Sequence, residues 1–232
     1  MKLAYLIPFC LFLNISYSQD LYTYEKIDST LHAWQEMFGY DSHPSVDYDG
    51  FGVIYNLDTI GYSSQDNLPI FAVKLSAHAD IKEAQPRVLI LGQCHAEEIY
   101  GVEIAMEIIN QFLHPEQFQG NRTFLQKGLY FTEIWIVPTY NPEGLRVVHG
   151  YVEDGDEIQD VTYRKNKRDT DNNGFFDYVN GIGHDTDGVD LNRNYAFNWV
   201  FGDTLLTPCT GDCSYADDYD YYRGAYPESE SE

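Results

Sequence analysis

The chain has 232 residues, with 37 acidic against 14 basic side chains, and its formal net charge at pH 7 is −23. This charge argues against nucleic acid and against an anionic membrane surface as partners, because both require clustered Lys and Arg side chains. The hydrophobic fraction of 44% is sufficient for a core, and the length suits one domain.

Residues 1–18 have the pattern of a secretory signal. Lys2 precedes an apolar run from Leu3 to Leu13, and the small residues of Ser16 to Ser18 follow. The alternative is an N-terminal membrane anchor, although the run is shorter than the roughly 20 residues that span a bilayer. We therefore expect a secreted protein, extracellular or periplasmic, whose mature domain covers residues 19–232.

Two segments carry apolar side chains at helical spacing, residues 24–38 and residues 97–113. The apolar positions are Ile27, Leu31, Trp34 and Phe38 in the first segment, and Val102, Ala105, Ile109 and Phe112 in the second. Both segments are predicted to form amphipathic helices that bury one face.

Residues 68–76, 86–92 and 131–140 are rich in β-branched and aromatic side chains and predict strands. A strand, a helix and a strand in this order indicate a crossover unit and an α/β sheet. The aspartate-rich stretch from Glu153 to Asp190 is expected to be a loop.

The second and third predicted strands each end in a turn rich in polar side chains, "QCHAEE" and "TYNPEG". Functional sites of open α/β sheets lie beyond the carboxyl ends of the strands. We therefore expect the following side chains along one edge of the sheet: His95, Glu97, Glu98, Asn141 and Glu143.

His95 and Glu98 are three positions apart where a strand meets a helix. Side chains at this spacing can point at one ion, and an imidazole with a carboxylate suits zinc. The alternative is a helix-capping glutamate next to an ordinary surface histidine.

Two arginine segments are candidates for substrate contacts. Arg193 in "DLNRNY" can donate two parallel hydrogen bonds to a carboxylate, with Asn192 as a neutral donor. The alternative is an ion pair between Arg193 and a local aspartate. The basic cluster "YRKNKRD" offers an arginine that could stabilise an oxyanion, or it is a solvated cluster that balances nearby negative charge.

Residues 169–180 have the spacing of a calcium loop. The expected oxygen ligands are Asp169, Asp171, Asn173 and Asp177, with Gly174 at the sixth position. The twelfth position is Asn180 rather than glutamate, so weak or structural binding is expected. Asp185, Asp187 and Asp190 can add oxygens, and Asp190 can equally orient Arg193. The alternative is an acidic surface loop that binds no ion.

Three cysteines would remain after signal cleavage. Cys209 and Cys213 lie in a glycine-containing loop and can form a small disulfide or remain two free thiols. Cys94 ends an apolar run and is expected to be a buried, inert thiol.

The order of these motifs resembles the zinc carboxypeptidase family, the metallocarboxypeptidases of the carboxypeptidase A type. The likeness covers "GQCHAEEIYG", "YNPEGL", "YRKNKR", "GVDLNRNYAFNW" and "YRGAYPESESE", and so nearly the whole mature chain. It implies a mixed, largely parallel sheet flanked by helices, an α/β/α sandwich. It also implies hydrolysis of the C-terminal peptide bond of peptides or proteins.

The resemblance implies a role for each matched residue. His95 and Glu98 match the first two zinc ligands, and Arg164 matches the arginine that polarises the scissile carbonyl. Asn192 and Arg193 match the pair that binds the terminal carboxylate of the substrate. One departure is Glu97, because family members of this type commonly carry arginine there.

The end of the chain is the largest departure from the family. "YPESESE" resembles the segment just before a strand that carries the third zinc-binding histidine, and the general-base glutamate lies beyond it. The chain stops at Glu232, so we expect the amino-terminal portion of a longer enzyme or a truncated product. The last strands and helices would be missing, and an exposed apolar sheet edge would make the polypeptide poorly soluble.

Two other hypotheses remain open. The first is a non-catalytic, calcium-stabilised module that binds peptide C-termini through Asn192 and Arg193. The second is a degraded reading frame without function.

Overall fold

The computed structural model describes residues 21–177, 187–197, 199 and 221–230. Its helices are α1 (Tyr24–Phe38), α2 (Tyr100–Leu113), α3 (Arg122–Phe131) and α4 (Pro142–His149), with short 3-10 turns at η1 (Val46–Tyr48), η2 (Pro115–Gln117) and η3 (Leu191–Arg193). Its strands are β1 (Tyr55–Tyr62), β2 (Pro69–Leu75), β3 (Arg87–Gln93), β4 (Glu133–Thr139), β5 (Tyr151–Glu153) and β6 (Asp156–Ile158). The predicted signal and the Cys209–Cys213 pair lie outside the described residues. None of the described helices is both long enough and apolar enough to cross a membrane.

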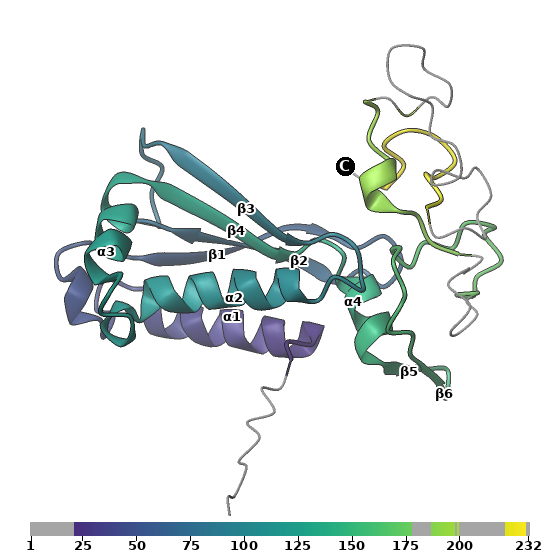
Figure 1. Ribbon diagram of the computed structural model, residues 1–232, viewed down its shortest axis with the longest axis horizontal. Coiled ribbons are helices and arrows are strands. Elements are labelled where there is room, and N and C mark those ends of the chain that lie inside the picture. The colour runs from purple at the N-terminus through teal and green to yellow at the C-terminus, as the bar shows by residue number, and fades with distance from the viewer. Residues whose placement is uncertain (1–20, 178–186, 198, 200–220, 231–232) are drawn as a thin grey trace, which may run out of the picture.

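The main sheet has four strands in the order β1-β2-β4-β3 (Figure 1). β2 pairs antiparallel with both β1 and β4, whereas β3 and β4 are parallel. The parallel pair is joined by a crossover through α2 and α3, as the strand–helix–strand order predicted. The mixed α/β fold is thus confirmed. The largely parallel pairing that was expected is not found in the described sheet, where β3 with β4 is parallel and the other two pairings are antiparallel.

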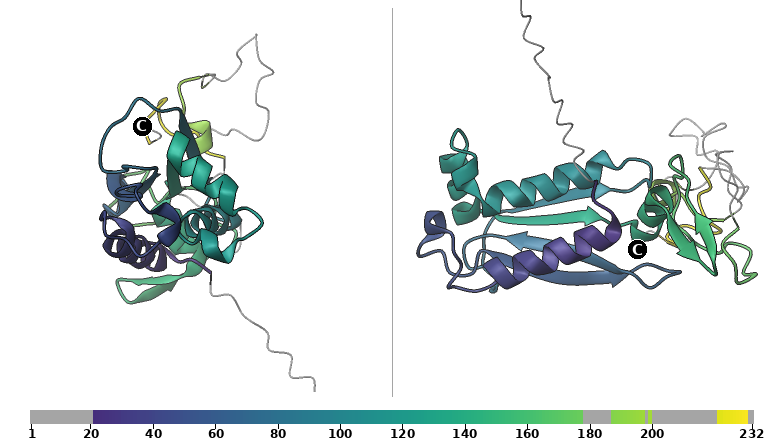
Figure 2. Two further views of the ribbon diagram at one scale, coloured as in Figure 1. Left: turned by 90° about the vertical axis from the view of Figure 1, so that its left-hand side faces the viewer. Right: turned by 90° about the horizontal axis from the view of Figure 1, so that it is seen from below.

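Helices α1 and α2 lie side by side on one face of this sheet (Figures 1 and 2). The apolar faces predicted for both helices are buried in the core between helices and sheet. Tyr55 of β1 connects the sheet to the helices, since its buried hydroxyl donates to the Leu31 carbonyl of α1. The buried hydroxyl of Tyr48 in η1 donates to the Phe112 carbonyl of α2. Burial of this apolar surface is the main stabilising contribution to the fold.

Several elements were not predicted from the sequence. β1 and α3 were missed, and the expected turn "NPEGL" begins helix α4, where the Asn141 side chain accepts a hydrogen bond from Gly144 N. The stretch expected to be loop from residue 153 onward starts inside a hairpin formed by β5 and β6. Its later described residues, up to Asp190, form no helix or strand.

Two glycines allow the start of α2 to lie close against the end of β3. A Cβ added to Gly92 would be 2.2 Å from the Pro138 carbonyl oxygen, and one added to Gly101 would be 2.7 Å from the Gly92 carbonyl oxygen. Both distances are far below van der Waals contact, so only glycine fits. The loop between these glycines, which carries the predicted metal ligands, is therefore fixed at both ends.

β3 is an edge strand of the described sheet. Val88, Leu89 and Leu91 are 46%, 64% and 50% exposed. An apolar edge was expected from the sequence, and such an edge is prone to pair with other chains. Poor solubility remains a prediction.

Candidate functional site

His95 and Glu98 lie in the loop between β3 and α2. Nδ1 of His95 is 3.0 Å from a carboxylate oxygen of Glu98. This nitrogen is buried, whereas the Glu98 side chain is exposed. Helix α2 begins only at Tyr100, so the pair precedes the helix instead of opening it. An imidazole nitrogen and a carboxylate oxygen that converge in this way fit a zinc ion.

Asp190 connects His95 to Arg164. One carboxylate oxygen is 3.3 Å from His95 Nε2, and the other accepts a hydrogen bond from Arg164 Nε at 2.8 Å. Burial opposes ionisation of Asp190, but its bonds to His95 and Arg164 outweigh burial and lower its pKa. The sequence suggested Asp190 as an ion ligand or as a partner for Arg193, and the structure places it next to His95 and Arg164.

The Arg164 guanidinium lies against His95, at the ring nitrogen that faces away from Glu98. Nη2 is 2.8 Å from His95 Nε2, and Nη1 donates to Glu97 at 3.2 Å. The second carboxylate oxygen of Glu97 is buried without a hydrogen-bond partner, and burial raises the pKa of this group. The acidic residue that departs from the family pattern therefore pairs with Arg164.

A buried asparagine holds these segments together. The Asn141 side-chain amide donates to the carbonyls of Cys94 and Lys165, both at 3.0 Å. A backbone bond from Ala96 N to the Arg164 carbonyl at 3.0 Å adds to this connection. The sequence placed Asn141 at the same sheet edge, but not as a connection between His95 and Arg164.

Two other residues of this edge differ in their environment. Glu143 was expected along the same edge of the sheet as His95, and its buried carboxylate accepts hydrogen bonds from the backbone of Gln65 and Asp66. It therefore stabilises the turn between β1 and β2. Cys94 is a free, half-buried thiol whose pKa is raised by burial, in agreement with an inert cysteine.

The two lysines of the basic cluster are buried, so the cluster is not solvated as the alternative supposed, although its charges do pair with acidic side chains. Lys165 and Lys167 are 0% and 1% exposed. Lys167 Nζ pairs with Asp66 at 2.9 Å and with Glu153 at 2.7 Å. These contacts anchor the chain on the C-terminal side of Arg164.

The segment around Asn166 also fixes the position of Asn192 and Arg193, the residues predicted to bind a substrate carboxylate. Asn166 N donates to the Val189 carbonyl at 3.1 Å, and Val189 N donates to the Asn166 side chain at 2.8 Å. Gly188, with φ of +88°, makes the turn before Val189 without strain. These bonds place η3 next to Arg164.

Arg193 and Asn192 lie in η3. The Arg193 guanidinium carbon is 5.8 Å from the centroid of the Tyr221 ring, and the Arg164 guanidinium carbon is 4.8 Å from the same centroid. The alternative for Arg193, an ion pair with a local aspartate, is not found among the described residues. Asn192 is exposed, and its carbonyl accepts a hydrogen bond from Arg193. The structure therefore brings both predicted arginines to one aromatic ring.

The calcium-like loop forms a different cluster from the predicted one. Ligand atoms of Asp169, Asp171 and Asp187 lie within 4.8 Å of one another. The Asn173 side-chain amide donates to the carboxylates of Asp171 and Asp177. The buried carboxylates of Asp169 and Asp187 already accept backbone hydrogen bonds within the loop. Calcium binding stays a prediction, and Asn180 and Asp185 lie outside the described residues.

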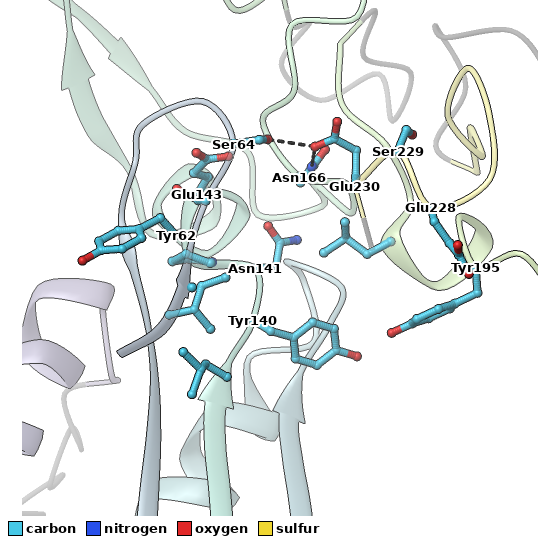
Figure 3. Close-up of a pocket in the computed structure, with 16 residues that line it drawn as sticks. Tyr62, Ser64, Tyr140, Asn141, Glu143, Asn166, Tyr195, Glu228, Ser229 and Glu230 are labelled. Carbon is cyan, nitrogen blue, oxygen red and sulfur yellow. Dashed lines mark hydrogen bonds between the residues drawn. The ribbon is translucent and has the colours of Figure 1, made fainter. Parts of the chain in front are cut away.

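A pocket of about 500 Å³ opens next to η3 (Figure 3). It lies between the turn after β1, the end of β4 and the segment 228–230. Tyr140 and Tyr195 point toward each other across it, and Glu230 closes one side through a hydrogen bond from Ser64 at 2.8 Å. Polar and aromatic side chains thus share its walls.

Comparison with known proteins identifies the class. Residues 51–232 match the family of zinc carboxypeptidases, and the fold and the His95–Glu98 site agree with this match. The chain belongs to the zinc carboxypeptidase family.

Individual relatives are distant. The zinc carboxypeptidase of Saccharothrix mutabilis subsp. capreolus is 26% identical over 146 residues, which cover 63% of this chain and 28% of the relative. Metallocarboxypeptidase A of Trichophyton rubrum is 25% identical over 146 residues, which cover 63% of this chain and 27% of the relative. The chain thus spans less than a third of the length of these relatives.

Solved structures support the fold. The crystal structure of thrombin activatable fibrinolysis inhibitor has a TM-score of 0.62 at 20% identity, covering 91% of this chain and 41% of that chain. The crystal structure of carboxypeptidase A from Helicoverpa armigera has a TM-score of 0.61 at 20% identity, covering 90% of this chain and 40% of that chain.

Proposed function

We propose that this chain contributes the first two zinc ligands and the substrate-binding arginines of a zinc-dependent metallocarboxypeptidase that hydrolyses the C-terminal bond of peptides or proteins. The observation that supports it is the convergence of His95, Glu98 and Arg164, with Arg193 against the same ring as Arg164. Family membership supports the reaction class.

His95 Nδ1 and Glu98 are the proposed zinc ligands. A zinc ion there would supply Lewis acidity and an activated water. A metal on Nδ1 would leave the proton on Nε2, and Asp190 at 3.3 Å can accept it once the Arg164 Nη2 donor, 2.8 Å from the same nitrogen, turns away. Asp190 would then hold the imidazole in orientation. Catalytic zinc normally has three protein ligands, and the described residues supply these two.

The proposed substrate contacts divide between the two arginines. Arg193, with Asn192, binds the terminal carboxylate, because a guanidinium donates two parallel hydrogen bonds to it. Arg164 donates to the scissile carbonyl and stabilises the charge that develops on its oxygen. A free C-terminus would thereby select the last peptide bond.

Binding of a free carboxylate tests the substrate part of this proposal. Calorimetry with acetyl-Gly-Phe and its C-terminal amide should show clearly tighter binding of the free acid. Arg193→Gln should remove about 2 kcal/mol of that preference. Lys127→Gln removes the same charge from an exposed site on α3 and should change nothing. Equal affinity for acid and amide would refute carboxylate recognition.

Release of phenylalanine tests the enzymatic part. Zinc-dependent release from acetyl-Gly-Phe supports the peptidase. Carboxylate binding without release under zinc supports the alternative, a non-catalytic module that binds peptide C-termini. We also propose that the protein is secreted, which detection of the processed chain outside the producing cytoplasm would test.

A further inference from the structure

Tyr221 is the one described side chain that contacts both predicted substrate arginines through its ring. The ring centroid is 4.8 Å from the Arg164 guanidinium carbon and 5.8 Å from that of Arg193. The two positively charged guanidinium groups therefore lie close to the same aromatic ring. The negative face of an aromatic ring attracts cations, so the ring offsets part of the repulsion between them.

Hydrogen bonds fix the segment that carries this ring. Asp190 N donates to the Tyr222 carbonyl at 2.8 Å, directly next to the bridge between His95 and Arg164. The buried side chain of Asn194 donates to the Arg223 carbonyl at 2.8 Å, and Trp199 Nε1 donates to the same oxygen at 3.0 Å. The ring of Tyr221 is therefore held against η3 by the chain on its C-terminal side.

Asn194 extends this attachment. Its side-chain oxygen accepts a hydrogen bond from Glu230 N at 2.7 Å, and its carbonyl accepts one from Glu228 N at 2.6 Å. The segment 221–230 and η3 thus form one hydrogen-bonded unit. Arg193, which lies within η3, keeps its place relative to Tyr221 when this unit is intact.

We propose that Tyr221 is a positioning residue that sets the spacing between Arg164 and Arg193 for a substrate with a free terminal carboxylate. This inference rests on the proposed function. A peptide C-terminus offers a carbonyl and a carboxylate separated by one residue, so affinity depends on how far apart the two guanidiniums are held. The ring supplies the contact, and the hydroxyl is not required for it.

Three variants separate the ring from the hydroxyl and from the segment. Calorimetry would measure the affinity for acetyl-Gly-Phe and for its amide, on protein with one equivalent of zinc and on metal-free protein. Tyr221→Leu should weaken binding of the free acid about tenfold and leave amide binding unchanged. Tyr221→Phe should retain wild-type affinity. Tyr226→Leu, at a 62% exposed tyrosine of the same segment, is the matched control and should also bind like the wild type.

Other results would overturn the inference. Wild-type affinity in Tyr221→Leu would show that the ring does not position the arginines. An equal loss in Tyr221→Phe would assign the effect to the hydroxyl, and an equal loss for acid and amide would assign it to general disorder. If the wild type itself does not prefer the acid, the proposed function fails. If it does and Tyr221→Leu keeps that preference, only this inference fails.

Discussion

Asp190 lies 3.3 Å from His95 Nε2, on the side of the imidazole opposite the nitrogen that faces Glu98. A carboxylate in this position fixes the orientation and tautomer of a metal-binding histidine. The same carboxylate accepts from Arg164, so one buried acid orients a proposed metal ligand and a proposed substrate contact.

Asp190→Asn should lower zinc affinity by about 10- to 100-fold, because the amide is a weaker acceptor for the imidazole N–H. Competition with a chromophoric zinc chelator measures this affinity. Asp58→Asn, at an exposed position of β1, is the control. Unchanged zinc binding in Asp190→Asn would contradict the orienting role.

Asn141→Ala should destabilise the protein by about 3 kcal/mol. The change removes the amide donors to the Cys94 and Lys165 carbonyls and the N-cap of α4, leaving buried groups unpaired. Urea denaturation followed by circular dichroism measures the free energy of unfolding. Asn110→Ala removes a side-chain amide that donates to the exposed Glu107 on the same helix, and it should cost far less. A loss no greater than that control would disprove the connecting role.

Glu133 should make stability depend on pH in the acid range. Burial opposes ionisation of its carboxylate, but bonds from Arg87 and Lys74 outweigh burial and lower its pKa from 4.5 to about 2. The unfolded chain then binds the proton more readily, so this contribution is complete above about pH 4.5 and is lost as pH falls toward 2. Glu133→Gln should flatten the decline in the free energy of unfolding over that window. A variant with the same pH profile as the wild type would contradict this.

Calcium should raise the thermal midpoint by a few degrees if the Asp169–Asp171–Asp187 cluster binds it, because a ligand of the folded state alone stabilises that state. Differential scanning calorimetry with millimolar calcium or a chelator tests this. Asp171→Asn, at an exposed member of the cluster, should remove the response. Identical midpoints for the wild type in both conditions would identify an acidic loop that binds no ion.

The sequence predicted the parts of the fold with strong periodicity. The helices around Leu31 and Ile109 and the strands that became β2 and β4 have apolar patterns that match their burial. The strand that became β3 is also apolar, but most of its residues are exposed at the edge of the described sheet. β1 was missed because its later residues are mostly exposed and its pattern is polar. Helix α4 was missed because "NPEG" is equally a turn sequence and a helix N-terminus, and only the Asn141 cap distinguishes them.

The sequence predicted which residue types form the candidate site, but it did not predict the contacts that connect them. His95 and Glu98 are close in sequence, so their spacing together with their position at the end of a strand suggested a metal pair, with a helix-capping glutamate as the alternative. The roles of Asp190 and Tyr221 depend on contacts with residues far along the chain, which no local pattern encodes. Burial of Lys165 was likewise unexpected, since a run of basic residues usually lies at the surface.

Asn141 joins the carbonyls of residues 94 and 165, and Asp190 joins side chains from the same two regions. The site therefore cannot be complete until residues almost a hundred positions apart have met. Contacts of such sequence separation form slowly, because loop closure precedes any favourable interaction. During synthesis at the ribosome, the β3 end with His95 would emerge well before its orienting acid, so we expect productive metal capture to follow chain folding and not to guide it.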